Sequence, residues 1–157
     1  MSQKNKTVFQ FISEPSDVNF GGKVHGGMVM KWIDQAAYAC ACNWAENYCV
    51  TVYVGGIRFY KPIGIGDLVK VEARVIHTGT SSIHIAVDVL SKKIATSHYH
   101  KTTHCVIVFV SVDADGKPTP APKWIPKTED EIKVEEYAIK LKDLRKTIAD
   151  EMSEYLK

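Results

Sequence analysis

The longest hydrophobic stretch of the chain runs from residue 25 to about residue 44 and has the periodicity of a helix. Its apolar positions leave little room for a wide polar face: Met28, Val29, Met30, Trp32, Ile33, Ala36, Ala37, Ala39, Cys40, Ala41, Trp44 and Ala45. A helix that is apolar on almost every side is normally covered by other structure. The pattern therefore predicts one central helix with a sheet around it.

Five other segments have the composition or the two-residue alternation of strands: residues 7–12, 49–60, 68–78, 82–94 and 103–112. The Gly55-Gly56 pair interrupts the second segment, as expected of a bulge or of close approach by a ligand. Gly66-Asp67 and Gly79-Thr80 are short turns, which predict antiparallel hairpins between the strands that they join.

The order of strand, helix and then four strands predicts an α+β protein in the hotdog arrangement. In this arrangement an antiparallel sheet of about five strands wraps around one central helix. One small sheet cannot cover such a helix on every side, so we expect two subunits to pair. Residues 1–122 make up this predicted domain.

Residues 123–157 are predicted to form a linker and an amphipathic C-terminal helix. Four prolines between residues 118 and 126 favour an extended linker, and Thr128 with Glu131 makes a capping box. The helix has one apolar stripe, made of Leu141, Leu144, Ile148, Met152 and Tyr155. We expect this stripe to dock on its own subunit or on a neighbouring one.

Charge divides unevenly along the 157 residues, although the formal net charge is only +2. Residues 1–126 carry 13 Lys and Arg against 9 Asp and Glu, whereas residues 127–157 carry 7 against 9. The positive domain mildly favours an anionic ligand, and the lack of long basic runs argues against nucleic acid. The first residues contain no long apolar stretch, so neither a signal peptide nor a membrane span is expected.

The cysteines and histidines do not have the spacing of a metal or disulfide framework. Cys40, Cys42, Cys49 and Cys105 contain no pair of Cys-x-x-Cys motifs, so we expect no metal site. A secreted disulfide scaffold is equally unexpected, which favours a cytoplasmic location.

Asp34 is the polar residue that stands out in the predicted helix. An ionised carboxylate that is removed from water needs a partner, or its pKa rises until it protonates. Two interpretations remain open. Lys31, Asp34 and Gln35 lie within about 100° of one another on the helix and would form a narrow solvated stripe. Alternatively, Asp34 has a chemical function.

The start of the helix offers a second candidate feature. Gly26 and Gly27 would let a substrate approach the unpaired N–H groups of the first turn, which favour developing negative charge. They are therefore candidates for an oxyanion hole at a substrate carbonyl. Asp34 lies roughly two turns, ~10 Å, further along the helix. If paired subunits place these helices antiparallel, Asp34 of one chain would face the helix start of the other.

Several ordered motifs continue from this region. The first is Asp17-x-Asn19-x-x-Gly22-x-Val24-His25-Gly26-Gly27, followed by Met30 and Asp34-x-Ala36-Ala37. The later ones are Gly56-Ile-Arg58-Phe59-Tyr-Lys61-Pro62 with Gly66-Asp67, Gly79-Thr80-Ser81-Ser82, and Val112-Asp-x-Asp-Gly116-Lys-Pro118. Together they resemble the broad-specificity acyl-CoA thioesterases that include brain acyl-CoA hydrolase, over roughly residues 8–122.

This resemblance implies hydrolysis of acyl-CoA to a free carboxylic acid and CoA, in dimers that assemble as trimers of dimers. It implies that Asp34 is the general base or nucleophile and that Asn19 is a second polar active-site residue. The backbone of Gly26 and Gly27 corresponds to the carbonyl-polarising turn. CoA is then part of the substrate and product, so no separate cofactor is implied. From the residues alone, Asn19 also fits an ordinary turn.

The phosphates of CoA need cationic side chains or the N–H groups of turns. Two regions are the first candidates: Arg58 with Lys61, and the turn of Gly79, Thr80, Ser81 and Ser82. Lys92 and Lys93, at the end of a neighbouring strand, are further candidates. Met28, Trp32 and Tyr53 are expected to help set the depth of the acyl pocket.

Two other functions remain open. A hotdog hydratase or dehydratase would act on a thioester without releasing a thiol, and His25 is the residue that such chemistry could use. The sites of those enzymes have a different His-containing loop, however, which this chain lacks. His25 also fits a cap of the helix start. A non-catalytic acyl-CoA sensor would use the same pocket and report through the C-terminal helix. Release of a free thiol separates hydrolysis from both.

Overall fold

Five antiparallel strands form one sheet in the order β1-β3-β4-β5-β2. In the computed structural model, which describes residues 4–156, they are β1 (Lys6–Ile12), β2 (Cys49–Phe59), β3 (Leu68–Thr78), β4 (Ser82–Lys92) and β5 (His100–Ser111). A short 3-10 helix η1 (Pro15–Asp17) and the helix α1 (Gly26–Ala45) lie between β1 and β2, and α2 (Glu129–Tyr155) follows β5. The predicted hotdog arrangement is confirmed.

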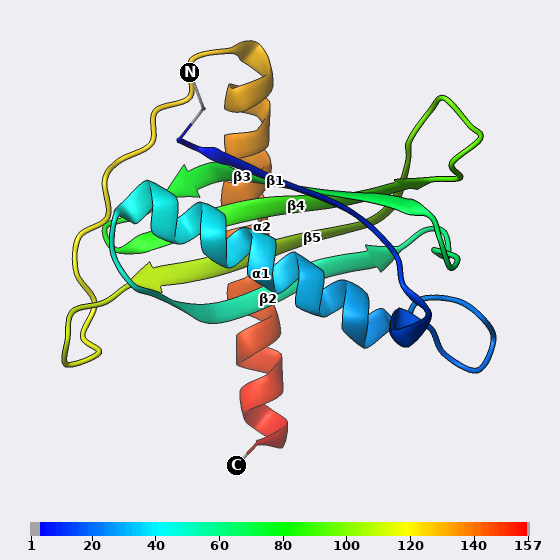
Figure 1. Ribbon diagram of the computed structural model, residues 1–157. Coiled ribbons are helices and arrows are strands. Elements are labelled where there is room, and N and C mark those ends of the chain that lie inside the picture. Colours follow the sequence, from blue (N-terminus) through cyan, green and yellow to red (C-terminus); the bar gives the residue numbers. More distant parts are fainter. Residues whose placement is uncertain (1–3, 157) are drawn as a thin grey trace.

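Helix α1 covers one face of the sheet, here called the α1 face (Figure 1). Apart from Trp32, its inward side consists of small and branched side chains, which let the helix approach the sheet closely. The buried residues are Val29, Trp32, Ile33, Ala36, Ala37, Cys40 and Ala41. They pack against alternate residues of the strands, such as Val69, Val71, Val87 and Val89. Each large side chain buried in this way contributes roughly 1.5–3 kcal/mol. The contact between α1 and the sheet therefore forms the main core.

The strand order overturns one of the two predicted hairpins. The Gly79-Thr80 turn joins the neighbours β3 and β4, as expected. The Gly66-Asp67 turn does not join neighbours, because β2 pairs with β5 whereas β3 pairs with β1 and β4. Residues 60–67 instead cross the end of the sheet. There Asp67 is buried and accepts hydrogen bonds from Gly64 N at 2.8 Å and Lys93 Nζ at 2.7 Å.

Strand β2 forms one edge of the sheet and is irregular. Its pairing with β5 shifts register between Thr51 and Tyr53 and again between Gly55 and Arg58. Gly56 has a φ of 63°, which L side chains rarely adopt. The predicted interruption at Gly55-Gly56 is therefore confirmed. Within residues 4–156, no strand pairs with the outer side of β2.

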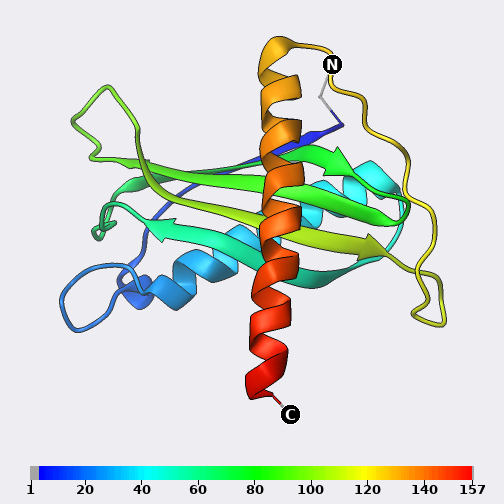
Figure 2. The same ribbon diagram turned by 180° about the vertical axis from the view of Figure 1, so that it is seen from behind.

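Helix α2 crosses the opposite face of the sheet, here called the α2 face (Figure 2). Its first half packs through Val134, Tyr137, Ala138 and Leu141 against Ile76, Ala86 and Val106. The predicted capping box is present, because Thr128 Oγ1 accepts from Glu131 N and the Glu131 carboxylate accepts from Thr128 N, each at 3.1 Å. Neither helix in the described part of the chain is long and apolar enough to cross a membrane.

Candidate active site

The outward side of α1 is open along its whole length. Gly27, Met30, Asp34 and Tyr38 recur at three- and four-residue steps and are exposed, and Lys31 and Gln35 are exposed beside them. The expectation of a helix wrapped on nearly all sides is therefore wrong for the single chain, because its sheet covers only the inward side. In this chain Asp34 belongs to a solvated stripe. The stripe also contains large apolar side chains, which solvent alone would not favour.

Asp34 has one side-chain partner within residues 4–156. The hydroxyl of Thr51, on β2, donates to Asp34 Oδ1 over 3.4 Å, which is a long hydrogen bond. No ion pair joins Lys31 to Asp34 in this part of the chain, although the helix spacing allows one. The carboxylate therefore sits between α1 and the edge strand with most of its capacity to accept hydrogen bonds unused.

Helix α1 begins with backbone donors that have nothing to bind. Within the described residues, no acceptor is recorded for the N–H groups of Gly26 and Gly27. A Cβ built on Gly27 would have no atom within 4 Å, and one on Gly26 would meet only the Phe59 ring, at 3.7 Å. A shallow pocket opens at this end of the helix, lined by Val24, Gly26, Val29, Phe59, Tyr60, Lys61, Pro62, Ile63 and Thr103. A polar ligand atom can therefore reach these donors.

His25 precedes the helix at the N-cap position, but its side chain makes no capping bond. Its backbone takes part instead, since His25 N donates to Asp17 O at 2.9 Å and His25 O accepts from Val29 N at 3.0 Å. The interpretation of His25 as a cap is thus correct for its position and wrong for its imidazole.

Asn19 organises the loop that leads into α1. Its Oδ1 accepts from Gly21 N at 2.9 Å and from Lys23 N at 3.3 Å, and Gly22 adopts a φ of 76° to close the turn. The turn role that its sequence neighbourhood allowed is therefore present. The amide Nδ2 makes no hydrogen bond to residues 4–156, so one end of Asn19 is structural and the other end is free to donate.

The two halves of the expected site are separated within one chain. Gly27 and Asp34 lie on the same helix, roughly two turns and ~10 Å apart along its axis. One thioester carbonyl cannot contact both, because a hydrogen bond spans about 3 Å. Whatever joins the two halves must come from outside the chain.

The predicted CoA-binding residues also form two groups. Arg58, Lys61, Lys92 and Lys93 belong to the end of the sheet where β2 and β4 finish, which is also the end where α1 starts. The turn of Gly79, Thr80, Ser81 and Ser82 lies at the other end of the sheet, between β3 and β4. Each subunit therefore brings only the first group close to its own Gly26-Gly27 turn.

Contacts within the chain already occupy part of both groups. Lys93 pairs with the buried Asp67, and Lys92 donates to Thr96 O at 3.3 Å and lies 5.2 Å from the centre of the Tyr99 ring. In the turn, Gly79 N donates to Ser82 O at 3.0 Å, while Thr80 O and Ser81 O accept from other segments. Arg58 stacks 5.8 Å above Tyr60 with its guanidinium exposed, and Lys61 is exposed as well.

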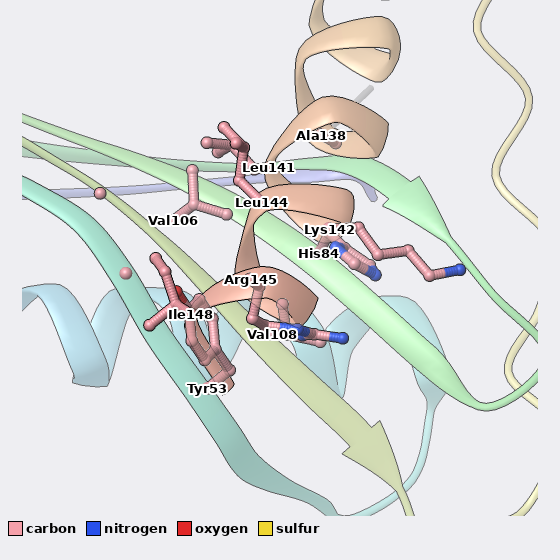
Figure 3. Close-up of a pocket in the computed structure, with 12 residues that line it drawn as sticks. Tyr53, His84, Val106, Val108, Ala138, Leu141, Lys142, Leu144, Arg145 and Ile148 are labelled. Atoms are coloured by element: carbon pink, nitrogen blue, oxygen red, sulfur yellow. The ribbon is translucent and has the colours of Figure 1, made fainter. Parts of the chain in front are cut away.

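The residues expected to shape an acyl pocket do not gather in one place. Tyr53 faces α2, where Arg145 lies 5.0 Å from its ring centre (Figure 3). Trp32 is buried against Phe11, with ring centroids 4.8 Å apart, whereas Met28 is half-buried near the start of α1. The expectation for Tyr53 is therefore wrong, because the register shift after Thr51 breaks the alternation of β2.

Three of the four cysteines are kept unreactive by burial. Burial raises the pKa of the thiols of Cys40, Cys49 and Cys105 to about 12, so they stay protonated at neutral pH. No group of three or more His, Cys, Asp or Glu side chains placed to hold a metal is found among the described residues. The exposed carboxylate of Asp34 is the candidate base on the α1 face.

Thr51 is the site residue that the sequence did not suggest. It is an ordinary residue of a strand, and only the strand order brings β2 to the exposed flank of α1. The available signal was chemical: an acid on a mostly apolar helix needs a donor, and a hydroxyl on the following strand can supply one.

An open carboxylate and backbone donors without recorded acceptors, on the central helix of a hotdog domain, are groups that an enzyme of this fold could use on a thioester. Comparison with known proteins agrees. Residues 21–98 match the family model of the thioesterase superfamily. The acyl-CoA thioester hydrolase YciA of Salmonella typhimurium is 35% identical over 122 residues, which are 76% of this chain and 92% of that protein.

Solved structures extend the likeness to three dimensions. A hexameric acyl-CoA thioesterase without ligand is 33% identical with a TM-score of 0.88, covering 92% of both chains. An acyl-CoA hydrolase of Staphylococcus aureus, solved with butyryl coenzyme A, coenzyme A and coenzyme A disulfide, is 27% identical with a TM-score of 0.86. That match covers 96% of this chain and 94% of the other. This chain belongs to the thioesterase superfamily, among the single-hotdog acyl-CoA thioesterases, and is an enzyme.

Three further structures of the Staphylococcus aureus enzyme each carry one alanine substitution, of an asparagine, an aspartate or a threonine. The asparagine precedes the aspartate by 15 residues and the threonine follows it by 17. Asn19, Asp34 and Thr51 have the same separations in this chain. The contact between Thr51 and Asp34 thus joins two positions that this spacing singles out.

Proposed function

We propose that this enzyme hydrolyses acyl-CoA thioesters to a free carboxylic acid and CoA, with Asp34 as general base or nucleophile. The observation that carries the proposal is the placement of Asp34. Its carboxylate is open, bonded only to the Thr51 hydroxyl within residues 4–156, on the same exposed stripe as the unpaired N–H groups that start α1. The names of the similar proteins, which are acyl-CoA hydrolases, support the same reaction.

Two copies share each site in this proposal. The outer side of β2 offers unpaired backbone groups, and Val52 and Val54 are 53% and 47% exposed along it. An edge of this kind favours pairing with another strand. A twofold axis beside β2 would run the α1 helices of the two copies antiparallel, so that Asp34 of one chain faces Gly26-Gly27 of the other. The hexameric relatives support further assembly as a trimer of dimers.

The reaction then follows from the positions of the groups. Asp34 removes a proton from water, the resulting hydroxide attacks the thioester carbonyl carbon, and the oxygen that becomes negative accepts hydrogen bonds from the helix-start N–H groups. The C–S bond breaks and the CoA thiolate takes up a proton. In the nucleophilic variant, Asp34 Oδ attacks first and water hydrolyses the resulting mixed anhydride. Both variants consume one water and release one acid and one thiol.

Asn19 and Thr51 assist Asp34 in different ways. Thr51 donates to the carboxylate and fixes the side-chain rotamer of Asp34 from the edge strand. Asn19 uses Oδ1 to hold its own turn and keeps Nδ2 free, so it can orient the water or the thioester from the partner chain. A donor held by its own turn in this way costs little to order when the substrate binds.

We propose that the phosphates of CoA bind to cations near the start of α1 and to a turn from another subunit. Arg58 and Lys61 are exposed there, with Lys92 and Lys93 at the neighbouring strand end. The Gly79-Thr80-Ser81-Ser82 turn lies at the far end of its own sheet, so it can contribute only between subunits. CoA is substrate and product, and the proposal includes no separate cofactor. The four free cysteines suit the reducing cytoplasm, where we place the enzyme.

The test is a thiol-release assay over acyl-CoA esters of increasing chain length. Asp34→Asn keeps the size of the side chain and removes the base, so kcat should fall at least ~100-fold while CoA binding and the thermal midpoint stay near those of wild type. Gln35→Ala, the matched change on the same exposed stripe, should leave kcat within about threefold. Unchanged turnover in Asp34→Asn contradicts the catalytic role. Absence of thiol release from every ester contradicts the proposed reaction.

A further inference from the structure

The segment of residues 60–67 crosses the end of the sheet beside the start of α1 (Figure 1). It belongs to no helix or named strand, and its residues Lys61, Pro62 and Ile63 line the pocket at the helix start. Connecting segments are normally more mobile than the elements that they join. The hydrogen bonds of this segment therefore decide how firmly it supports that side of the site.

Gly64, in the middle of the segment, is tied to the ends of two paired strands. Gly64 N donates to Asp67 Oδ2 at 2.8 Å, and Gly64 O accepts from Ser13 Oγ at 2.5 Å. Ser13 Oγ also accepts from Asp67 N at 3.1 Å. Ser13 follows β1 and Asp67 precedes β3, and these two strands pair with each other up to that end. We call Ser13, Gly64 and Asp67 the Gly64 network.

The Gly64 network is buried although its groups are polar. Ser13 is 2% exposed and Asp67 is 4% exposed. A buried carboxylate needs hydrogen bonds, and that of Asp67 receives them from Gly64 N and from Lys93 Nζ at 2.7 Å. A Cβ on Gly64 would lie 2.8 Å from Lys93 Nζ, so glycine leaves room for the ammonium. Such directional bonds fix one backbone position, which apolar packing alone does not.

From this network, hydrogen bonds run to the residues just before α1. Val24 N donates to Ile63 O at 2.8 Å, and Lys23 forms an antiparallel bridge with Gly64. Val24 is two residues from Gly26, where α1 begins. The direction of the first N–H groups of α1 therefore depends on where residues 63 and 64 are held.

The same bridge supports the loop that carries Asn19. Lys23 O accepts from Asn19 N at 2.7 Å, and Lys23 N donates to Asn19 Oδ1 at 3.3 Å. Lys23 thus joins Gly64 on one side to Asn19 on the other. The donors of the helix start and the amide of Asn19 are supported from the same point.

We propose that Asp67 is a positioning residue for thioester hydrolysis, which acts through Gly64 and residues 23–24 on the N–H groups that start α1. Its carboxylate is buried away from the pocket at the helix start, so it does not touch the substrate. The inference rests on the proposed function, because it requires those N–H groups to bind the thioester oxygen. An oxyanion donor must point to the place where charge develops, and a shift of about 1 Å can cost about 100-fold in rate.

Two substitutions of Asp67 separate its hydrogen bond from its charge. Asp67→Ala removes the acceptor of Gly64 N, so kcat should fall about 10- to 100-fold while KM for acyl-CoA stays within about threefold. Asp67→Asn keeps an oxygen for Gly64 N and loses the ion pair with Lys93, whose side chain is 64% exposed. Water can replace that pair, so kcat should stay within about threefold of wild type.

The control for lost stability is Asn47→Ala, which removes hydrogen bonds beyond the other end of α1. Its kcat should stay within about threefold of wild type. The thiol-release assay is run where circular dichroism shows every variant folded. Equal losses of kcat in Asp67→Ala and Asp67→Asn, or in Asp67→Ala and Asn47→Ala, overturn the positioning role. A rise of KM at unchanged kcat overturns it as well.

Ser13→Ala keeps the inference testable if Asp67→Ala does not fold. It removes the other tether of Gly64, the bond from Ser13 Oγ to Gly64 O, and should lower kcat about 10-fold with little change of KM. A wild-type kcat in folded Ser13→Ala contradicts the inference.

A double variant tests whether Asp67 acts through the helix start. In Gly27→Pro one donor is already missing, so adding Asp67→Ala should lower kcat by at most about threefold more. The full 10- to 100-fold loss in that background would show that Asp67 acts elsewhere, and it overturns the inference while the proposed function stands. A wild-type kcat in Gly27→Pro alone overturns the proposed role of the N–H groups, and the inference with it. The two failures are therefore distinguishable.

Discussion

The two faces of the sheet differ in how fully their polar groups are hydrogen-bonded. On the α2 face, His104 bridges Asp88 and Tyr137 at 2.8 and 3.0 Å, and His77 bonds Glu135 at 3.0 Å. On the α1 face, Asp34 has one hydroxyl partner at 3.4 Å in the described chain. The helix-start N–H groups have none there. These polar groups of the α2 face are paired within one chain, whereas those of the α1 face are largely unpaired in the described residues.

The difference separates structural from functional polar groups. Burial alone would raise the pKa of Asp88, but hydrogen bonds from His104 and Lys101 outweigh it and hold that pKa below its usual value. Such groups fasten α2 to the sheet. A carboxylate with one long hydrogen bond and two backbone amides with no recorded acceptor in the described chain have no such structural use. In the proposed dimer, a second copy and a thioester would complete them.

The largest expected effect is a loss of kcat when a backbone donor at the start of α1 is removed. Gly27→Pro removes one N–H group, and the first helical turn tolerates proline because that donor has no helical partner. Loss of an oxyanion donor should lower kcat about 100- to 1000-fold. Gly27→Ala keeps the N–H and adds a Cβ into open space, so it is the matched control in the thiol-release assay. Equal rates for the two variants would rule out the backbone donor.

The next effect belongs to the α2 face and concerns stability. Burial, aided by the charges of His77, Arg145 and Lys142, lowers the pKa of His84 to about 4. The unfolded state therefore binds the proton first, and stability is lost as the pH falls from about 6.5 to 4. Between pH 7 and pH 5 this costs about 2 kcal/mol. Urea unfolding at fixed protein concentration should show a smaller acid loss in His84→Gln, and an equal loss would contradict the assignment.

A smaller loss of kcat is expected when the hydrogen bond from Thr51 to Asp34 is removed. Thr51→Ala removes the donor to the carboxylate, which is worth about 1 kcal/mol, so kcat should fall about 5- to 10-fold. Thr51→Ser restores the hydroxyl and should recover most of the rate. The KM for acyl-CoA should change little, because the bond holds the catalytic group and not the ligand. Failure of the serine to rescue would point to packing instead.

The smallest effect should leave catalysis untouched. Tyr137→Phe removes the bond from Tyr137 to His104 and should cost about 1 kcal/mol of stability, seen as a lower thermal midpoint. The kcat/KM should stay at the wild-type value because Tyr137 lies on the α2 face. A loss of activity in a variant of normal stability would contradict the prediction that polar groups on the α2 face take no part in catalysis.

Local patterns predicted the elements well because they carry strong periodicity. The helix at residues 26–45 and the alternating strands follow from side-chain order alone. Strand order does not, because alternation says which face a residue occupies but not which strand lies beside it. The prediction of a hairpin at Gly66-Asp67 was wrong for this reason. The expectation that Tyr53 lines the acyl pocket was wrong because the register shift after Thr51 places its side chain on the α2 face.

The site was only partly predictable for a different reason. Counting apolar residues indicated that α1 must be covered, but it could not tell a chain's own sheet from a second copy. Asp34 and the Gly26-Gly27 turn were found because they break the apolar pattern. Thr51 does not break any pattern, and its contact with Asp34 spans 17 residues of sequence and two different elements.

The central claim is that Asp34 acts on a carbonyl held by the other chain, and mixing two inactive variants tests it most directly. Asp34→Asn and Gly27→Pro are co-refolded and assayed for thiol release. A mixed dimer then contains one site with both wild-type groups and one site with neither. Random pairing makes half of the dimers mixed, so the account predicts recovery to about one quarter of the wild-type rate. If both groups act within one chain, no intact site can form, and a mixture that stays as inactive as its components would contradict the account.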